Sequence, residues 1–156
     1  MNKYFTKEYI EECKAEEIQI IRRQIRYEEG LSYQKFYKGD YRYYEDAPQK
    51  DNIVLVTKDE LWQVNVHYWL PTGDQLDEEI VRICKKNNID YSFFFTCVED
   101  LKIEYIYEAG IEMNIIYSAK FDHITFCESD NPLIAKIKLL KELLKESEEK
   151  WQTLTI

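Results

Sequence analysis

The chain has 156 residues, 45% of them hydrophobic and 33% charged, which is the length of one ordinary domain and too apolar for intrinsic disorder. Its 30 acidic and 21 basic residues give a formal net charge of −9, so the summed field repels phosphate backbones and disfavours nucleic-acid binding unless the acidic surface itself imitates a nucleic acid. The sequence contains no run of the roughly 18 apolar residues that a transmembrane helix needs, and its first residues lack the apolar segment of a signal peptide, so we expect a cytoplasmic protein without membrane contact.

The possible metal ligands and thiols are scattered along the chain. No two cysteines form a C-x-x-C pair, and a chain of this length folds without disulfide bridges. We therefore predict that the cysteines are reduced thiols in the core, and that the chain holds no structural metal and no cofactor. The residues concerned are Cys13, Cys84, Cys97, Cys127, His67 and His123.

Residues 1–30 are predicted to contain an N-terminal helix that begins after Thr6, a residue type that caps helices. Apolar residues recur on roughly one face of this helix, but their spacing breaks between Cys13 and Ile18. The helix therefore either bends or ends early, near Gln19, with extended chain after it.

Three arginines in this segment form the one basic cluster of an acidic sequence. Arg22, Arg23 and Arg26 form either a solvated helix face or a site for an anionic ligand.

Residues 31–70 are rich in tyrosine and are predicted to form short strands. A Gly39-Asp40 turn among the aromatic residues indicates a hairpin or a pair of short strands. Tyrosine supplies rigid contact area at interfaces, and it also fills sheet faces that helices cover, so both fates stay open for this segment. Its aromatic residues up to position 44 are Tyr33, Phe36, Tyr37, Tyr41, Tyr43 and Tyr44.

The second half of this tyrosine-rich region has two patterns typical of strands. Residues 53–57, Ile-Val-Leu-Val-Thr, read as a buried strand, and residues 62–68 alternate apolar and polar side chains. In that alternation His67 falls on the polar face, so we expect it to face solvent.

Residues 71–149 are predicted to form a helix, an antiparallel meander and a second helix. Thr72 has the properties of an N-cap for the first helix, and Asn131 caps the last one with Pro132 at its first position. Between the helices, apolar and polar residues alternate on both sides of an expected reversal at Ala109-Gly110. Leu76, Ile80, Ile83 and Cys84 form the expected core stripe of the first helix, and Leu133, Ile137, Leu140 and Leu144 that of the second. The fold class is therefore α+β, with an antiparallel sheet flanked by helices in a single domain of residues 1–156.

The segment that leads into the last helix resembles a known family. It places Pro132, Leu133 and Ala135 after Asp130, and with the preceding helix and strands it resembles the phage ABA-sandwich domain, found in small proteins of bacteriophages and prophages. Three further segments are similar to parts of phage proteins that carry Trp-Leu-Pro followed by Asp-Gln-Leu: K-A-E-E-I-Q (14–19), G-D-Y (39–41) and W-L-P-T-G-D-Q-L (69–76). The resemblance implies a three-layer helix/sheet/helix arrangement and a phage or prophage origin, hence a bacterial host cytoplasm. The resemblance implies no catalytic residue.

Three classes of function are open to such a chain. The first, which we favour, is a non-enzymatic binding protein that blocks a host protein, for example a component of an antiviral defence system; a homo-oligomer is also possible. Its candidate contacts are Trp69, Tyr41, Tyr43, Tyr44, Asp74, Asp77 and Glu78, although core packing is the more ordinary fate for Trp69. The second is a binder of a nucleotide signal, with Arg22, Arg23 and Arg26 on the phosphates and nearby tyrosines on the bases.

The third class, an enzyme, has the weakest support in the sequence. Carboxylate pairs such as Glu104 with Glu108, or Glu108 with Glu112, have a spacing that acid-base catalysis could use. Carboxylates at alternating strand positions are ordinarily just solvated, so we predict no catalytic residues.

Overall fold

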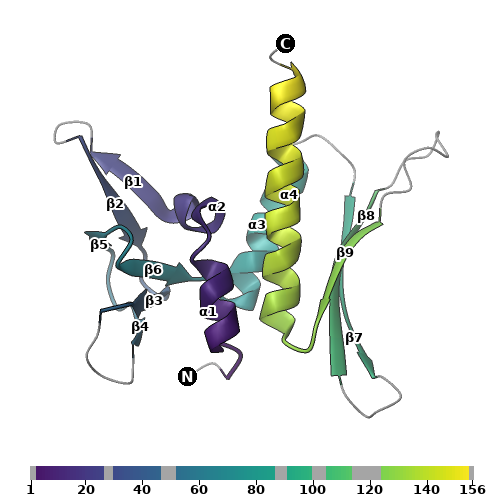
Figure 1. Cartoon of the computed structure of the whole chain (residues 1–156), viewed down its shortest axis with the longest axis horizontal. Coiled ribbons are helices and arrows are strands. Elements are labelled where there is room, and N and C mark those ends of the chain that lie inside the picture. Colours follow the sequence, from purple (N-terminus) through teal and green to yellow (C-terminus); the bar gives the residue numbers. More distant parts are fainter. Residues whose placement is uncertain are drawn as a thin grey trace. The chain divides into compact units, whose positions relative to one another are not determined.

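The computed structural model describes residues 3–26, 30–46, 52–86, 91–99, 105–113 and 124–154 (Figure 1). The chain divides into two compact units, unit 1 from Met1 to Thr72 and unit 2 from Gly73 to Ile156. The expectation that both belong to a single domain stays a prediction.

Unit 1 begins with short helical segments that pass directly into a strand. Helix α1 (Lys7–Cys13) is followed by α2 (Glu16–Gln19), a 3-10 turn (Ile20–Arg22) and strand β1 (Arg23–Arg26). The Thr6 side chain accepts a hydrogen bond from the Tyr9 backbone N–H at 3.2 Å, which confirms the predicted cap. The helix therefore ends early, near Gln19, as the broken apolar spacing allowed.

Together with β1, the remaining five described strands of unit 1 make up two antiparallel three-stranded sheets, and β1 belongs to the first of them. They are β2 (Leu31–Phe36), β3 (Tyr41–Tyr44), β4 (Ile53–Leu55), β5 (Glu60–Gln63) and β6 (His67–Leu70). The first sheet has the order β1-β2-β5 and the second has the order β4-β3-β6. The turn at Gly39-Asp40 thus joins two sheets and does not close a hairpin, so of the two options left open the pair of short strands is the observed one.

The two sheets of unit 1 pack face to face. Between them, the Trp62 ring lies 4.6 Å from the His67 ring, and the Arg42 guanidinium lies 4.6 Å from the Trp62 ring. The other face of the second sheet is covered by the N-terminal segment, where Phe5 meets Tyr41 edge to face at 5.1 Å. Unit 1 therefore consists of a helical layer, the second sheet and the first sheet, in that order.

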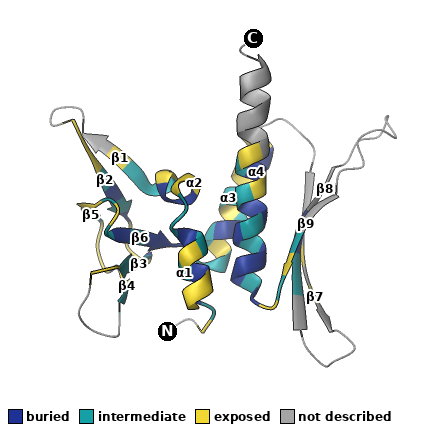
Figure 2. Cartoon of the chain, viewed as in Figure 1, coloured by how far each residue is buried: buried dark blue, intermediate teal, exposed yellow. Residues whose placement is uncertain are grey.

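Two strand predictions in unit 1 were wrong. Residues 62–68 do not form one strand, because Asn65 adopts a positive φ of 66° in a turn that sends β5 and β6 into different sheets. The turn reverses the phase of the alternation, so His67 is only 7% exposed and faces the interior. Strand β4 exists but is short, and its Val54 and Leu55 are exposed where a buried strand was expected; Figure 2 shows this contrast with the buried β6.

Unit 2 has the predicted helix-meander-helix order. Its elements are α3 (Gly73–Lys86), β7 (Tyr91–Glu99), β8 (Tyr105–Met113), β9 (Ile124–Ser129) and α4 (Pro132–Leu154). The strands pair antiparallel in the order β7-β8-β9, α4 contacts β8 and β9, and α3 contacts α4. The Leu133 N–H donates to Asn131 Oδ1 at 2.9 Å, which confirms the predicted cap of α4. The α+β class, with antiparallel sheets flanked by helices, is thereby confirmed.

The core stripes of the two helices are largely as predicted. On α3 all four expected residues are buried, and on α4 three of four are buried while Leu144 is half-buried. The cysteine prediction holds for Cys13 and Cys84, which are buried free thiols, and is wrong for Cys97, which is exposed on β7.

The predicted reversal at Ala109-Gly110 was wrong. Both residues are buried inside β8, where Ala109 pairs with Phe95 of β7 and with Cys127 of β9. Residues opposite one another share a face, and Lys136 of α4 lies 4.3 Å from the Phe95 ring, so Ala109 faces α4. The small side chain of Ala109 lets the helix pack close to the strand. In the sequence, an Ala-Gly pair that serves such packing cannot be distinguished from one that forms a turn.

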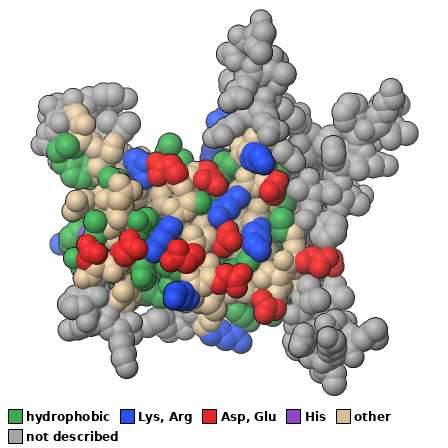
Figure 3. Space-filling model, viewed as in Figure 1, with side chains coloured by type: hydrophobic (Ala, Val, Ile, Leu, Met, Phe, Trp, Pro, Cys, Tyr) green, Lys and Arg blue, Asp and Glu red, His purple; other side chains and the backbone are tan. Residues whose placement is uncertain are grey.

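Charge is unevenly divided between the two units. Residues 73–156 contain 17 acidic and 10 basic residues, whereas residues 1–72 contain 13 and 11. On the face that Figure 3 shows, acidic and basic side chains lie intermixed.

Among the described helices, none is both long enough and apolar enough to cross a membrane.

Candidate functional site

The first sheet of unit 1 presents one face to the second sheet and the opposite face outward. Along β2, Gln34 and Phe36 are buried, while Leu31 is 52% exposed and the side chains of Tyr33 and Lys35 are half-buried. Directly opposed residues of an antiparallel pair lie on the same face, so the register assigns the outward residues of all three strands. Among the residues whose side chains the structure describes, we call this set the outer face: Gln24, Leu31, Tyr33, Lys35, Leu61 and Gln63.

An apolar hollow lies where β5 leaves the first sheet. Pairing between β2 and β5 ends at Tyr33 and Gln63, and β5 turns away at Val64 while β2 continues to Leu31. The hollow left beside β2 has a volume of about 450 Å³. It is lined by Gly30, Leu31, Ser32, Tyr33, Leu61, Trp62, Gln63 and Val64.

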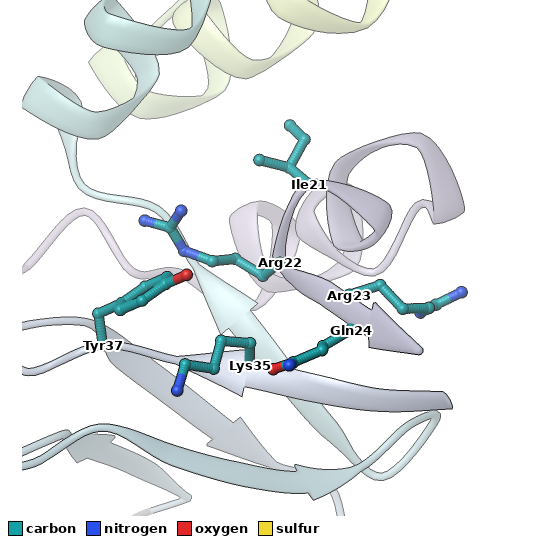
Figure 4. A pocket seen from close by; sticks show the side chains of 6 residues that line it. All are labelled: Ile21, Arg22, Arg23, Gln24, Lys35 and Tyr37. Atoms are coloured by element: carbon teal, nitrogen blue, oxygen red, sulfur yellow. The ribbon is translucent and has the colours of Figure 1, made fainter. Parts of the chain in front are cut away.

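A second, cationic hollow of about 380 Å³ lies at the other end of β2 (Figure 4). It is lined by Ile21, Arg22, Arg23, Gln24, Lys35 and Tyr37. The Arg22 guanidinium lies 5.1 Å from the Tyr37 ring and Lys35 Nζ lies 5.3 Å from it, so two cations meet one aromatic ring. Figure 4 shows Arg22 reaching toward Tyr37 and Arg23 pointing the other way.

Two of the three arginines predicted for an anionic ligand already have carboxylate partners. Arg22 Nε lies 3.4 Å from Oδ2 of the buried Asp40, and Arg23 forms an ion pair with Glu16. The side chain of Arg26 lies outside the described residues. Lys35, by contrast, forms no ion pair with any residue that the structure describes, and it therefore gives the outer face an uncompensated positive charge.

The Trp-Leu-Pro corner is a structural junction. Trp69 is fully buried, so its assignment as a partner contact is corrected: the ring packs in the core, with the Arg22 guanidinium 4.3 Å from it. The Tyr9 hydroxyl donates to the Pro71 carbonyl at 2.6 Å. Burial and the nearby Cys13 raise the pKa of Tyr9 well above its ordinary value, so this hydroxyl remains a donor.

Gln19 holds the same corner through its side-chain amide. Its Oε1 accepts from the Trp69 N–H at 2.8 Å, and its Nε2 donates to the Trp69 carbonyl at 2.9 Å and to the Cys13 carbonyl at 2.6 Å. Gln34 Nε2 donates to Gln19 Oε1 at 3.0 Å. Sequence reasoning missed Gln19 and Gln34, because glutamine is usually exposed and no sequence pattern marks a buried amide.

The three candidate tyrosines of β3 make contacts within unit 1 and do not form one patch. Tyr41 meets Phe5, the Tyr43 ring lies 6.5 Å from the Tyr68 ring, and Tyr44 stacks on His67 at 4.6 Å. Since residues alternate along the strand, Tyr44 points to the face opposite that of Tyr41 and Tyr43. All three are half-buried, and none belongs to the outer face.

The candidate acidic residues lie on α3 in unit 2. Asp74 and Glu78 are exposed, and Asp77 forms an ion pair with Lys136 at 3.0 Å. The first turn of a helix is an electrostatically favourable position for acidic residues, so local helix stability accounts for Asp74.

A partly buried polar cluster lies between the two sheets. Arg42 Nη1 donates to His67 Nδ1 at 2.8 Å, and Arg42 Nε lies 3.4 Å from Glu60 Oε1. Burial and the neighbouring Arg42 charge lower the pKa of His67 below its ordinary value. An arginine can only donate, so the Nδ1 atom of His67 carries no proton and the histidine is neutral.

The carboxylate pairs that an enzyme would need fall largely outside the described residues. Glu104 and the side chain of Glu112 lie there, and Glu108 is half-buried on β8. No group of three or more metal-ligating side chains occurs within the part of the chain that the structure describes.

Comparisons of the chain with protein-family models, with curated proteins and with solved structures give no match. The similarity to phage proteins therefore stays a prediction, and function is inferred from the chemistry of the outer face and its two hollows.

Proposed function

We propose that this chain is a non-enzymatic binding protein that contacts a protein partner through the outer face of the first sheet. The observation that carries the proposal is the exposure of apolar surface on a sheet face: Leu31 is 52% exposed, and it borders a hollow of about 450 Å³ with Leu61 and Trp62. Exposed apolar side chains that line a common hollow are typical of protein-binding surfaces.

The composition of the outer face supports a protein partner. Gln24, Tyr33 and Gln63 lie opposite one another across the three strands and form a row of two amides around one aromatic ring. Interfaces combine aromatic contact area with hydrogen-bonding groups at the rim, and this row has both.

The similarity to phage proteins suggests the kind of partner. A phage or prophage protein acts in a bacterial host, so we propose that the partner is a host protein, such as a component of an antiviral defence system, and that contact blocks its activity. The net charge of −9 supports solubility at the concentrations that stoichiometric inhibition requires.

Capture from a bacterial lysate with three baits tests the proposal: the wild-type chain, Leu31→Asp and Leu55→Asp. Leu31 and Leu55 are 52% and 53% exposed, but Leu55 lies on β4 of the second sheet, which makes it a matched control. Wild type and Leu55→Asp should recover the same protein in a stoichiometric amount, as measured by native mass spectrometry. Leu31→Asp should recover at least tenfold less of that protein. Equal recovery by Leu31→Asp, with folding verified by circular dichroism, would contradict the proposal.

A second candidate function is the binding of a nucleotide signal in the cationic hollow. Its support is the placement of Arg22, Lys35 and the 45% exposed Tyr37 around one space of about 380 Å³. In this function Lys35 would contact phosphate and Tyr37 would stack on a base.

A thermal-unfolding panel of linear and cyclic nucleotides tests this candidate. A ligand at 100 times its Kd stabilises the folded chain by about 2.7 kcal/mol, and Tyr37→Ala together with Lys35→Ala should abolish the shift. If no nucleotide raises Tm, this function is eliminated.

A further inference from the structure

Strand β2 has an open side at its first two residues. Its pairing with β1 runs from Leu31 to Gln34, whereas its pairing with β5 runs from Tyr33 to Phe36. Within the described residues, Leu31 and Ser32 thus have a neighbouring strand on one side only. The apolar hollow lies on the other side.

This open side suits an extended chain. The N–H and C=O groups of successive residues in a strand point to alternate sides, so one of Leu31 and Ser32 presents both groups toward the hollow. A segment that enters at the hollow can pair with these groups there, cover Leu31 with an apolar side chain and continue over the outer face along β2, because β5 already occupies the edge beside Lys35.

The charge on the outer face lies four residues farther along β2. Leu31 and Lys35 share this face, and a strand rise of about 3.3 Å per residue separates them by about 13 Å. Arg22 lines the same end of the face but already meets the Asp40 carboxylate, whereas Arg23 lies opposite Gln34 and therefore on the other face of the sheet. Among the side chains that the structure describes on this face, Lys35 is therefore the cation that a carboxylate from outside would neutralise.

We infer that the outer face takes an extended segment of the partner that carries an apolar side chain and, about four positions away, an aspartate or glutamate. The inference rests on the proposed protein-binding function and specifies the partner's chemistry. The apolar side chain lies over Leu31 in the hollow, the carboxylate pairs with Lys35, and the amides of Gln24 and Gln63 flank the middle of the segment.

Selection from a random dodecapeptide display library, with the full biotinylated chain as bait, tests this inference. The baits are wild type, Leu31→Asp and Lys35→Glu, with Leu55→Asp and Lys58→Glu as controls at exposed positions outside both hollows. Wild type and the controls should enrich peptides with an apolar residue and an acidic residue four positions apart. Leu31→Asp should reduce the enrichment at least tenfold, and Lys35→Glu should replace the acidic preference by lysine or arginine.

Three results would overturn the inference: no enrichment on wild type, the same peptides on Lys35→Glu, or a wild-type dimer in sedimentation that Leu31→Asp dissociates, which would make a second copy of the chain the occupant. If lysate capture still depended on Leu31, the proposed function would survive the first two. If lysate capture did not depend on Leu31, that result would refute the proposed function, independently of the peptide selection.

Discussion

At the scale of single residues, Gln19 explains why the Trp-Leu-Pro corner has so definite a structure. Its side-chain amide accepts from the Trp69 N–H and donates to the Trp69 carbonyl, as a neighbouring strand would do. One side chain thus completes the hydrogen bonding of β6 and ties α2 to the sheet. Trp69 is a core residue because this corner is the place where the N-terminal segment attaches.

Replacement of Gln19 by leucine is expected to destabilise the fold by about 2–4 kcal/mol. The substitution leaves the Trp69 backbone groups and the Cys13 carbonyl buried without partners, and each such group costs about 1–3 kcal/mol before relaxation. Urea unfolding measures the change. Gln24→Leu, at an exposed position, is the control and should stay within about 0.5 kcal/mol of wild type; equal effects of the two substitutions would refute this role of Gln19.

His67 is expected to make stability fall in mild acid. Its pKa is lowered in the fold by burial and by Arg42, so the unfolded chain binds the proton more readily. The free energy of unfolding should therefore decrease as the pH falls below the ordinary histidine pKa of about 6.5. Protonation would also place a second donor against Arg42 Nη1.

Urea unfolding of wild type and His67→Gln between pH 5 and 7.5 isolates this effect. Glutamine can accept from Arg42 but does not titrate, so the variant should lose less stability toward pH 5 than wild type does. The other ionisable groups are present in both proteins, and because Glu60 and Asp46 interact with His67, the difference reports the titration of His67 together with its coupling to them. Identical pH dependence in the two proteins would show that His67 is not linked to folding.

At the scale of the elements, helices were predicted well because their determinants are local. Thr6 and Asn131 cap helices through bonds to residues two or three positions away, and the apolar stripe of α3 follows the helical period. The strands were predicted less well, since their phase depends on single backbone conformations. One positive φ at Asn65 reversed the face on which His67 was expected.

The same limit applies to β8, where tertiary packing determines the identity of small residues. Ala109 is buried against α4 in the middle of the strand, yet Ala-Gly in a sequence is equally compatible with a reversal. The outer face could not be predicted for a related reason: which residues share it depends on the register between β1, β2 and β5, and no local sequence pattern contains that register.

Ala109→Leu is expected to destabilise the fold by about 1–3 kcal/mol, because the larger side chain overpacks the space between β8 and α4. Thermal or urea unfolding measures the loss. Val81→Leu on the exposed side of α3 adds one methylene group without steric conflict and should stay near wild type. An unchanged stability of Ala109→Leu would mean that α4 does not pack closely on Ala109.

At the scale of the whole molecule, we assign binding to unit 1 although unit 2 holds most of the negative charge. Unit 2 has 17 acidic and 10 basic residues, and its Asp74 and Glu78 are exposed, so a basic partner would be drawn to α3. The outer face instead combines exposed apolar surface with an uncompensated Lys35. Binding at the outer face and binding at α3 therefore predict that a partner covers different residues of the chain.

Hydrogen–deuterium exchange of the chain, alone and with the protein that it captures, is the measurement that separates the two most directly. If the outer face is the binding surface, the partner should slow exchange in residues 30–36 and 60–64 and leave residues 73–86 unchanged. Protection confined to residues 73–86 would contradict the account and transfer the binding function to the acidic face of α3.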